Sequence, residues 1–242
     1  MSVTLITTTG SRPEAFNFCE KYIQRQKFLK NTKENIQWIV IDDNIKQPTI
    51  CTLGQEYYAN PMQAEGKFNT QRPGLAFALT KVKGDNVFII EDDDFYFENY
   101  IEVYNDFLKH AFLVGEGNAL YYDVKSRLYK RMENYKGASL CQTAFRKTSI
   151  ATIEKAVHSG ELYIDSYLWA RKASIKSILF TGLDLSVGIK GMPGRAGIGV
   201  GHKMSLEDPK VKSDKDLLQL PQFLESKQDA ERYRNYYVKP EV

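Results

Sequence analysis

The chain has 242 residues, 43% of them hydrophobic and 26% charged, with a formal net charge of +3. This is the profile of a globular protein that buries its own core, which excludes disordered and fibrous classes, and the charge is too small to indicate nucleic-acid binding by itself. No apolar run approaches the ~18 residues of a membrane span, and the N-terminus lacks the pattern of a signal peptide. Cys19, Cys51 and Cys141 are odd in number and widely separated, so we expect reduced thiols in a cytoplasmic protein.

The first half of the chain alternates between strand and helix patterns. Short apolar runs rich in β-branched residues predict strands, and apolar residues at helical spacing predict helices. The expected order is strand 2–9, a helix from Pro13, strand 36–43, helix 73–82, strand 86–90 and helix 100–108. This alternation predicts an α/β fold with a largely parallel sheet.

The second half alternates less regularly. We expect strands within 110–124 and 135–146, helices at 149–157 and 161–173, and a loop at 188–203, which holds six glycines and a proline. From Ser213 onward the pattern is mostly helical, with an interruption at Pro221. We predict a single domain over 1–203, made of two halves (1–98 and 99–203), and a C-terminal helical extension over 204–242.

Polar residues gather at the ends of three of the predicted strands. They are Thr8, Thr9, Gly10, Ser11 and Arg12 at the first, Asp42 and Asp43 at the second, and Glu91, Asp92, Asp93 and Asp94 at the third. Open α/β sheets bind ligands at the carboxyl ends of their strands. Hydroxyls with an arginine suit phosphate or ribose oxygens, and a carboxylate pair suits ribose hydroxyls or a base edge. Each strand end taken alone also fits a helix cap or a turn.

The acidic run from Glu91 to Asp94 directly follows an apolar strand. Carboxylates held close together raise one another's pKa values unless a cation neutralises them. Hard cations such as Mg²⁺ and Mn²⁺ prefer oxygen ligands and are often shared with phosphates. The run therefore predicts a site for a divalent cation and a diphosphate.

Three segments together resemble the GT-A glycosyltransferases, and the family 2-like members in particular. They are an N-terminal strand running into TTTGSRP, a second strand ending in VIDD, and the segment GLAFALTKVKGDNVFIIEDDD. In that family the third segment is a helix, a small turn and an apolar strand that ends in a DxD metal motif. The resemblance implies a Rossmann-like fold with a mostly parallel central sheet flanked by helices. It also implies that residues 1–98 bind a nucleotide-sugar and that residues 99–203 carry the acceptor and catalytic side.

Asp92, Asp93 and Asp94 match the DxD motif. The resemblance implies that Asp92 and Asp94 reach Mn²⁺ or Mg²⁺ and the diphosphate of a nucleoside-diphosphate sugar, a UDP-sugar being favoured, while Asp93 sits near the donor ribose or sugar. A register starting one residue earlier, at Glu91, also fits the motif. Arg72, in NTQRPG, falls where the family often places a donor-contacting residue.

The segment YIDSYLWARKA is similar to a helix of the family whose aspartate is the general base of inverting members. By this match Asp165 is the base, although Ile164 stands where the family usually has an acid. A carboxylate can take the proton of an acceptor hydroxyl as it attacks the anomeric carbon. The alternative is that Asp165 caps its helix.

His202 follows the glycine-rich segment. In many GT-A enzymes a late histidine completes the metal site, and imidazole ligates Mn²⁺. Arg195 and Lys203 would then neutralise the diphosphate leaving group. The alternative is an exposed loop histidine, and His110 and His158 are interpreted as structural or exposed.

The acceptor is left open by the sequence. Acceptor contacts are predicted for Ser139, Gln142 and Arg146, and phosphate contacts for Lys125, Arg127, Lys130 and Arg131 if the acceptor is a hydroxymethylated base in DNA, as in phage-type enzymes. A glycan or a protein side chain are alternative acceptors. A nucleotidyltransferase or a non-catalytic GT-A-like binding module are alternative functions.

Overall fold

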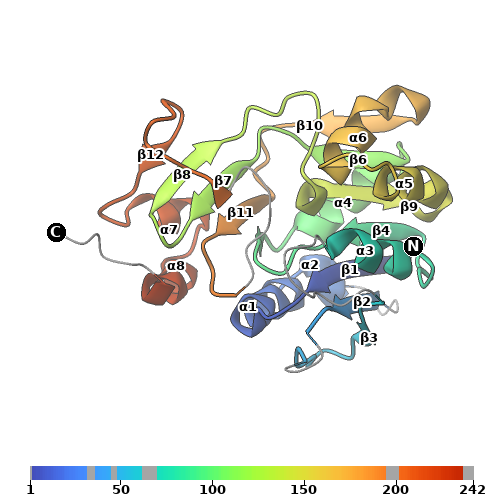
Figure 1. Cartoon of the computed structure of the whole chain (residues 1–242), viewed down its shortest axis with the longest axis horizontal. Coiled ribbons are helices and arrows are strands. Elements are labelled where there is room, and N and C mark those ends of the chain that lie inside the picture. Colours follow the sequence, from blue (N-terminus) through green and yellow to red (C-terminus); the bar gives the residue numbers. More distant parts are fainter. Residues whose placement is uncertain (1, 32–35, 45–47, 62–69, 195–201, 237–242) are drawn as a thin grey trace.

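The computed structural model describes residues 2–31, 36–44, 48–61, 70–194 and 202–236 (Figure 1). The helices are α1 Pro13–Gln24, α2 Lys27–Asn31, α3 Gln71–Leu79, α4 Tyr100–Leu108, α5 Ile150–Val157, α6 Ile164–Ala170, α7 Gln219–Phe223 and α8 Lys227–Tyr233. The strands are β1 Val3–Thr9, β2 Ile36–Asp42, β3 Glu56–Ala59, β4 Asn86–Ile89, β5 Phe95–Tyr96, β6 Leu113–Glu116, β7 Leu120–Asp123, β8 Leu128–Arg131, β9 Thr143–Arg146, β10 Ser177–Phe180, β11 Ser186–Lys190 and β12 Lys212–Ser213. Short 3₁₀ turns include η1 Leu140–Gln142, η2 Lys147–Ser149 and η3 Lys172–Ser174.

The central sheet has seven strands in the order β10-β6-β9-β4-β1-β2-β3. Strand β1 pairs in parallel with β2 and β4, and only β9 runs antiparallel to its neighbours. Helices α1 and α4 pack on one face, and helices α3, α5 and α6 pack on the other. The predicted α/β fold with a mostly parallel sheet is therefore confirmed.

A second sheet of five strands, β12-β8-β7-β11-β5, stands beside the first. The sequence pattern missed its two-residue strand β5, which lies between the acidic run and the helix that begins at Tyr100. It also missed the β7–β8 hairpin, and it placed Gly188–Lys190 in a loop although they complete β11. Such short strands carry too few residues for a periodic pattern.

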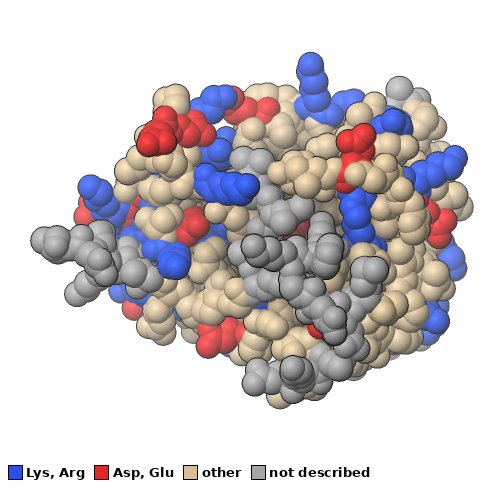
Figure 2. Space-filling view, viewed as in Figure 1, with Lys and Arg blue, Asp and Glu red and all other residues tan. Residues whose placement is uncertain are grey.

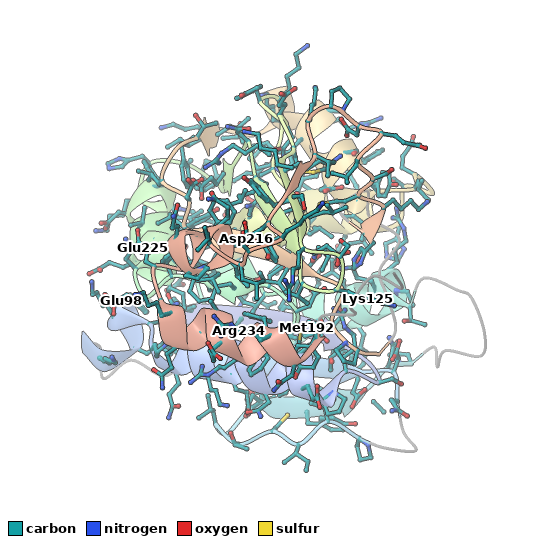
Figure 3. The ribbon with its side chains drawn as sticks, turned by 90° about the vertical axis from the view of Figure 1, so that its left-hand side faces the viewer. Glu98, Lys125, Met192, Asp216, Glu225 and Arg234 are labelled. Carbon is teal, nitrogen blue, oxygen red and sulfur yellow. The ribbon has the colours of Figure 1, made fainter. Side chains whose placement is uncertain are left out.

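The C-terminal elements pack into the core. Leu220, Leu224, Ala230 and Tyr233 belong to the apolar cluster on the α1 side of the central sheet. The hydroxyl groups of Tyr22 and Tyr233 are 2.8 Å apart, and Figure 3 shows α8 lying across α1. Pro221 lies within α7 instead of interrupting a helix. The domain boundary at residue 203 stays a prediction.

Truncating Tyr233 to alanine is expected to lower the free energy of unfolding by about 3 to 5 kcal/mol, because a large side chain leaves a cavity in a packed core. Tyr233 is 2% exposed. Urea unfolding followed by circular dichroism measures the change. The matched control is Tyr135→Ala, at a tyrosine that is 60% exposed. Equal effects in the two variants would contradict the docking of α8.

In the part of the chain that the structure describes, no helix has the length and apolar character needed to span a membrane. The three cysteines are free thiols, and Cys19 and Cys141 are buried.

Candidate active site

The acidic run lies at the carboxyl end of β4, in the middle of the central sheet. Parallel pairing sets Ile6 opposite Ile89, so Thr9 and Asp92, each three residues further along, reach the same level. The Thr9 hydroxyl donates a 2.7 Å hydrogen bond to Asp92 Oδ2. After the acids the chain turns into β5, and the Glu91 amide donates to the Tyr96 hydroxyl at 2.8 Å. The sheet therefore fixes both ends of the run.

Arg12 forms the first ion pairs of this acidic cluster, which we define as Glu91, Asp92, Asp93 and Asp94. Arg12 stands between β1 and α1, where Pro13 begins the helix. Its guanidinium contacts Asp92 Oδ1 at 3.1 Å and also pairs with Asp93. Arg12, predicted to contact phosphate or ribose oxygens, is thus paired with two carboxylates of the cluster, and its contact with a donor stays a prediction.

Lys190 supplies a second cation that the sequence analysis missed. Its ammonium lies 2.9 Å from Asp94 Oδ1, 3.5 Å from Asp93 Oδ2 and 3.9 Å from Glu91 Oε2. Strand β11 places it there because β11 pairs with β5 directly after the acidic run. The Ile189 amide also donates to Asp94 Oδ1 at 2.9 Å. The signal was weak, since one lysine at the start of a glycine-rich segment has no distinctive pattern.

Burial and mutual repulsion separate the pKa values of the four acids. Burial, followed by the charge of Asp94, raises the pKa of Glu91 to about 8. Burial raises the pKa of Asp92 to about 6 against the opposing effect of Arg12. Burial acts in the same direction on Asp93, but Arg12 and Lys190 outweigh it and hold its pKa at about 2. Groups with divergent pKa values in one place are typical of functional sites.

His202 lies beside this cluster. Burial, followed by the charge of Lys190, lowers the pKa of His202 to about 4, and the nearby Asp93 acts in the opposite direction. Its imidazole is therefore neutral at pH 7, the form that ligates metals. Lys203 is exposed, and Arg195 lies outside the described residues.

The start of the glycine-rich segment covers the end of β1. A Cβ added at Gly194 would lie 2.2 Å from the Ser11 carbonyl oxygen, and Gly194 has φ +104°. Only glycine fits such a conformation at such a close approach. Because Ser11 adjoins Arg12, this contact holds the segment directly against the acidic cluster.

At the second strand end, the two acids Asp42 and Asp43 have different surroundings. Asp42 is fully buried, and its carboxylate accepts hydrogen bonds from the Asn44 and Thr49 amides and from the Tyr57 hydroxyl. Those contacts give Asp42 a structural role in holding the chain that follows β2. Asp43 lies against Gly10, where an added Cβ would overlap its carboxylate, and it accepts a hydrogen bond from Thr70. Of the two acids, Asp43 is therefore the one whose carboxylate lies against Gly10, the residue that follows β1.

Thr8 lies at the same edge of the sheet. Its methyl group would be 3.2 Å from a Cβ added at Gly74, so α3 approaches the ends of β1 and β2 closely. Thr8 and Asp43 therefore lie at the carboxyl ends of β1 and β2, and their contact with a nucleoside stays a prediction.

Arg72 is engaged elsewhere. Its guanidinium donates to the Ala156 carbonyl at 3.2 Å and the Val157 carbonyl at 2.6 Å, and also to the Glu161 carbonyl. A cation is favourable at the carboxyl end of a helix such as α5. A donor contact by Arg72 stays a prediction that these bonds do not favour.

The proposed acceptor residues do not share one place. Arg146 pairs with Asn86 at the amino end of β4, the end of the strand opposite the acidic cluster. Its guanidinium donates to the Leu108 carbonyl at 2.6 Å. Ser139 accepts a hydrogen bond from Tyr121 at 2.8 Å, and Gln142 is buried. The strand register therefore places Arg146 at the end of the sheet opposite the acidic cluster.

Asp165 approaches the cluster from the other half. It stands in the first turn of α6, which Trp169 anchors through a 3.2 Å hydrogen bond to Thr143. Its Oδ1 accepts from the adjacent Ser166 amide at 2.8 Å, and α6 has no side-chain cap. Burial raises the pKa of Asp165, and its charge contributes to the raised pKa of Glu91. Asp165 therefore satisfies one first-turn amide of α6, and both the helix-cap role and the general-base role stay predictions.

The residues of the cluster fit a divalent cation. Asp94 Oδ2 is buried without a hydrogen-bond partner. Ligand atoms of Glu91, Asp94 and Cys141 lie within 4.8 Å of one another, whereas Asp92, Asp94 and His202 form no such group in the described structure. Burial keeps the Cys141 pKa raised, so the thiol stays protonated and the hard ligands are the two carboxylates. The ligand set of Asp92, Asp94 and His202 stays a prediction.

Comparison with solved structures identifies the fold. The chain superimposes on S. aureus TarS 1-349 with a TM-score of 0.55 at 10% identity, covering 78% of this chain and 60% of that one. It has the GT-A glycosyltransferase fold. The same TarS fragment in complex with UDP-GlcNAc gives a TM-score of 0.50 at 12% identity, with coverage of 81% and 60%. The mannosyltransferase PcManGT from Pyrobaculum calidifontis, in complex with GDP-Man and Mn²⁺, gives 0.52 at 13% identity, with coverage of 80% and 57%.

These GT-A structures are longer than this chain, which spans no more than about 60% of each. No family model matches the sequence, and no curated protein does. The resemblance therefore lies in the fold, and the chemistry of this chain depends on the residues of the acidic cluster and its surroundings.

Proposed function

We propose that this protein is a glycosyltransferase that moves a sugar from a nucleoside-diphosphate sugar, a UDP-sugar being favoured, to an acceptor hydroxyl. The observation that carries the proposal is the buried acidic cluster at the carboxyl end of β4. It is flanked by Arg12 and Lys190, it lies near Asp165, and it is positioned in a GT-A fold. The solved neighbours bound to UDP-GlcNAc and to GDP-Man with Mn²⁺ support a donor of this class.

The donor would lie along the edge formed by β1, β2 and β4. In this proposal Thr8 and Asp43 contact the nucleoside, and the diphosphate is neutralised by the positive charges of Arg12, Lys190 and Lys203. A bound Mn²⁺ or Mg²⁺, held by Asp94 with Glu91 or Asp92, supplies charge neutralisation of the leaving diphosphate. Arg195, which lies outside the described residues, is assigned to the diphosphate from the sequence alone.

Asp165 is the general base in this proposal. Its carboxylate takes the proton of the acceptor hydroxyl as that oxygen attacks the anomeric carbon and the bond to the diphosphate breaks. Attack from the face opposite the leaving group inverts the anomeric centre. The raised pKa of Asp165 increases its basicity, and a base is more effective as its pKa approaches the working pH.

The acceptor is a second part of the proposal. Four basic residues suggested for a DNA acceptor lie on or near the β7–β8 hairpin. Three of them have partners within the chain, whereas Lys125 is exposed. Lys130 contacts Asp208 at 3.1 Å, Arg131 contacts Asp184 at 2.6 Å, and Arg127 donates to the Lys215 carbonyl at 2.6 Å. Figure 2 shows basic side chains scattered among acidic and uncharged ones on the face that it displays. These pairs favour a glycan or protein acceptor over DNA.

A thermal-shift screen of nucleotide-sugars with and without Mn²⁺ tests the proposal. We expect one UDP- or GDP-sugar with Mn²⁺ to raise the unfolding midpoint, because a ligand at a hundred times its Kd stabilises the folded state by about 2.7 kcal/mol. Nucleoside triphosphates serve as the control, and stabilisation by them with pyrophosphate release would indicate a nucleotidyltransferase instead. Absence of any shift across the nucleotide-sugars would overturn the proposal.

A further inference from the structure

Lys190 stands at the centre of the acidic cluster on the Asp94 side. It is 4% exposed, and its ammonium contacts Asp93, Asp94 and Glu91 at distances between 2.9 and 3.9 Å. The ring of Tyr121 lies 5.3 Å from the same ammonium. Buried lysines are rare unless paired. Here a single ammonium group is paired with three carboxylates at once.

Arg12 and Lys190 pair with different acids of the cluster, except for Asp93, which contacts both. Arg12 binds Asp92 and Asp93 through two nitrogens of its rigid fork. Within the described structure, the cation that contacts Asp94 and Glu91 is Lys190 alone. These two acids are also the ones whose oxygens lie within 4.8 Å of each other in the group suited to a metal ion. The ammonium and a metal ion would therefore use the same two carboxylates.

Two positive centres cannot share these oxygens without a cost. A unit charge and a divalent ion about 5 Å apart repel strongly even when partly screened, and both need the Asp94 carboxylate. The Asp94 Oδ1 atom already accepts from Lys190 and from the Ile189 amide, whereas Oδ2 has no partner. A metal ion bound to Oδ2 would therefore be separated from the Lys190 ammonium, which is bound to Oδ1, by one carboxylate group only.

We propose that Lys190 is the resident counter-ion of the acidic cluster, that a divalent cation competes with its ammonium for Asp94 and Glu91, and that a donor diphosphate relieves this competition by taking up the ammonium. The last part rests on the proposed function. Lysine suits this role because its charge sits on a flexible four-carbon stem, whereas arginine holds carboxylates in a fixed fork. Lys190 is thus a positioning residue that couples metal binding to donor binding.

The coupling has a clear thermodynamic form. If diphosphate binding frees Asp94 and Glu91 from the ammonium, then nucleotide raises the affinity for metal and metal raises the affinity for nucleotide by the same factor. The metal-free protein is meanwhile protected from the repulsion of four adjacent carboxylates. We therefore expect the wild-type protein to bind Mn²⁺ weakly by itself and tightly together with UDP.

Equilibrium dialysis against Mn²⁺, with and without UDP or GDP, measures both affinities. In Lys190→Met, which keeps the length of the stem, Mn²⁺ alone should bind roughly tenfold to a hundredfold more tightly than to wild type. In wild type, UDP should raise the Mn²⁺ affinity by about tenfold, and this factor should shrink in Lys190→Met. Lys130→Met is the matched control, since Lys130 pairs with one carboxylate away from the cluster, and it should behave as wild type.

Thermal unfolding gives a second readout that does not involve activity. In EDTA, the unfolding midpoint of Lys190→Met should be roughly 6 to 20 °C lower than that of wild type, because removing one partner of a buried ion pair leaves the remaining charges buried without a partner. Mn²⁺ should restore much of that loss while shifting wild type little. If this variant does not fold, Lys190→Arg keeps the charge and should bind Mn²⁺ alone no better than wild type.

Equal Mn²⁺ affinity of wild type and Lys190→Met would overturn the competition, as would tighter Mn²⁺ binding by Lys190→Arg than by wild type. Tighter Mn²⁺ binding in Lys190→Met, with no effect of either UDP or GDP on the Mn²⁺ affinity of wild type, supports the competition and overturns the proposed donor. The two failures are therefore distinguishable.

Discussion

Replacing Asp94 by asparagine is expected to lower kcat/KM for sugar transfer by about a thousandfold or more. The substitution keeps the volume of the side chain but removes the charge of the carboxylate whose Oδ2 has no partner. Charge stabilisation by a metal at a leaving diphosphate contributes several kcal/mol, and each 1.36 kcal/mol changes a rate tenfold. Release of nucleoside diphosphate from the donor identified by the screen measures the effect.

The control for this loss is Asp208→Asn. Asp208 also pairs with a lysine, at 3.1 Å, but on the β8 side of the second sheet. It should retain wild-type turnover. If Asp94→Asn retained more than a tenth of wild-type activity with Mn²⁺ present, the metal would not depend on this carboxylate.

Asp165→Asn is expected to lower kcat by about a hundredfold to ten-thousandfold while leaving donor affinity unchanged, because a general base contributes that factor to the chemical step alone. Turnover with acceptor and calorimetric titration with nucleoside diphosphate separate the two quantities. Asp216→Asn, at an aspartate that lines a cavity together with Glu225 and Arg234, should change neither. A loss of donor binding equal to the loss of kcat would contradict the assignment of Asp165 as the base.

The pH dependence of kcat follows from the same assignment. A base must be deprotonated to act, so activity falls as the pH drops through its pKa. Burial raises the pKa of Asp165 above the ordinary aspartate value. The acidic limb of the profile should therefore lie above that value and disappear in Asp165→Asn. An unchanged acidic limb in the variant would assign it to another group.

The strands that carry the site were predictable because their patterns are long and apolar. β1 and β2 each have seven residues, nearly all buried, and Pro13 marks the start of α1. Their parallel order then follows from the alternation with helices. The acidic cluster could be placed at a sheet edge for the same reason, since it directly follows β4.

What could not be predicted depends on contacts between distant segments. Lys190 meets Asp94 only because β11 pairs with β5, and a two-residue strand leaves no periodic signal. Arg72 was assigned to the donor from its position in the chain, but it donates to carbonyls at the end of α5, 84 and more residues away. The hydrogen bonds that Asp42 accepts from Thr49 and Tyr57 likewise join segments whose proximity the sequence does not show.

The contacts of the acidic run explain how four acids can stand side by side in the chain. Four adjacent carboxylates would destabilise a strand end, yet Arg12 and Lys190 neutralise part of their charge within the chain. When all four are ionised, a formal charge of −2 remains, which a divalent cation balances. Repulsion that is only partly relieved is what makes such a cluster a site for a cation.

Calorimetric titration of UDP and GDP into the protein, in Mn²⁺ and then in EDTA, tests the central claim most directly. The account expects one of these nucleotides to bind with one-to-one stoichiometry in Mn²⁺. It also expects the affinity to fall at least about tenfold in EDTA and in Asp94→Asn, in line with the coupling between metal and diphosphate. Binding that is absent in Mn²⁺, or equal in wild type and Asp94→Asn, would contradict it.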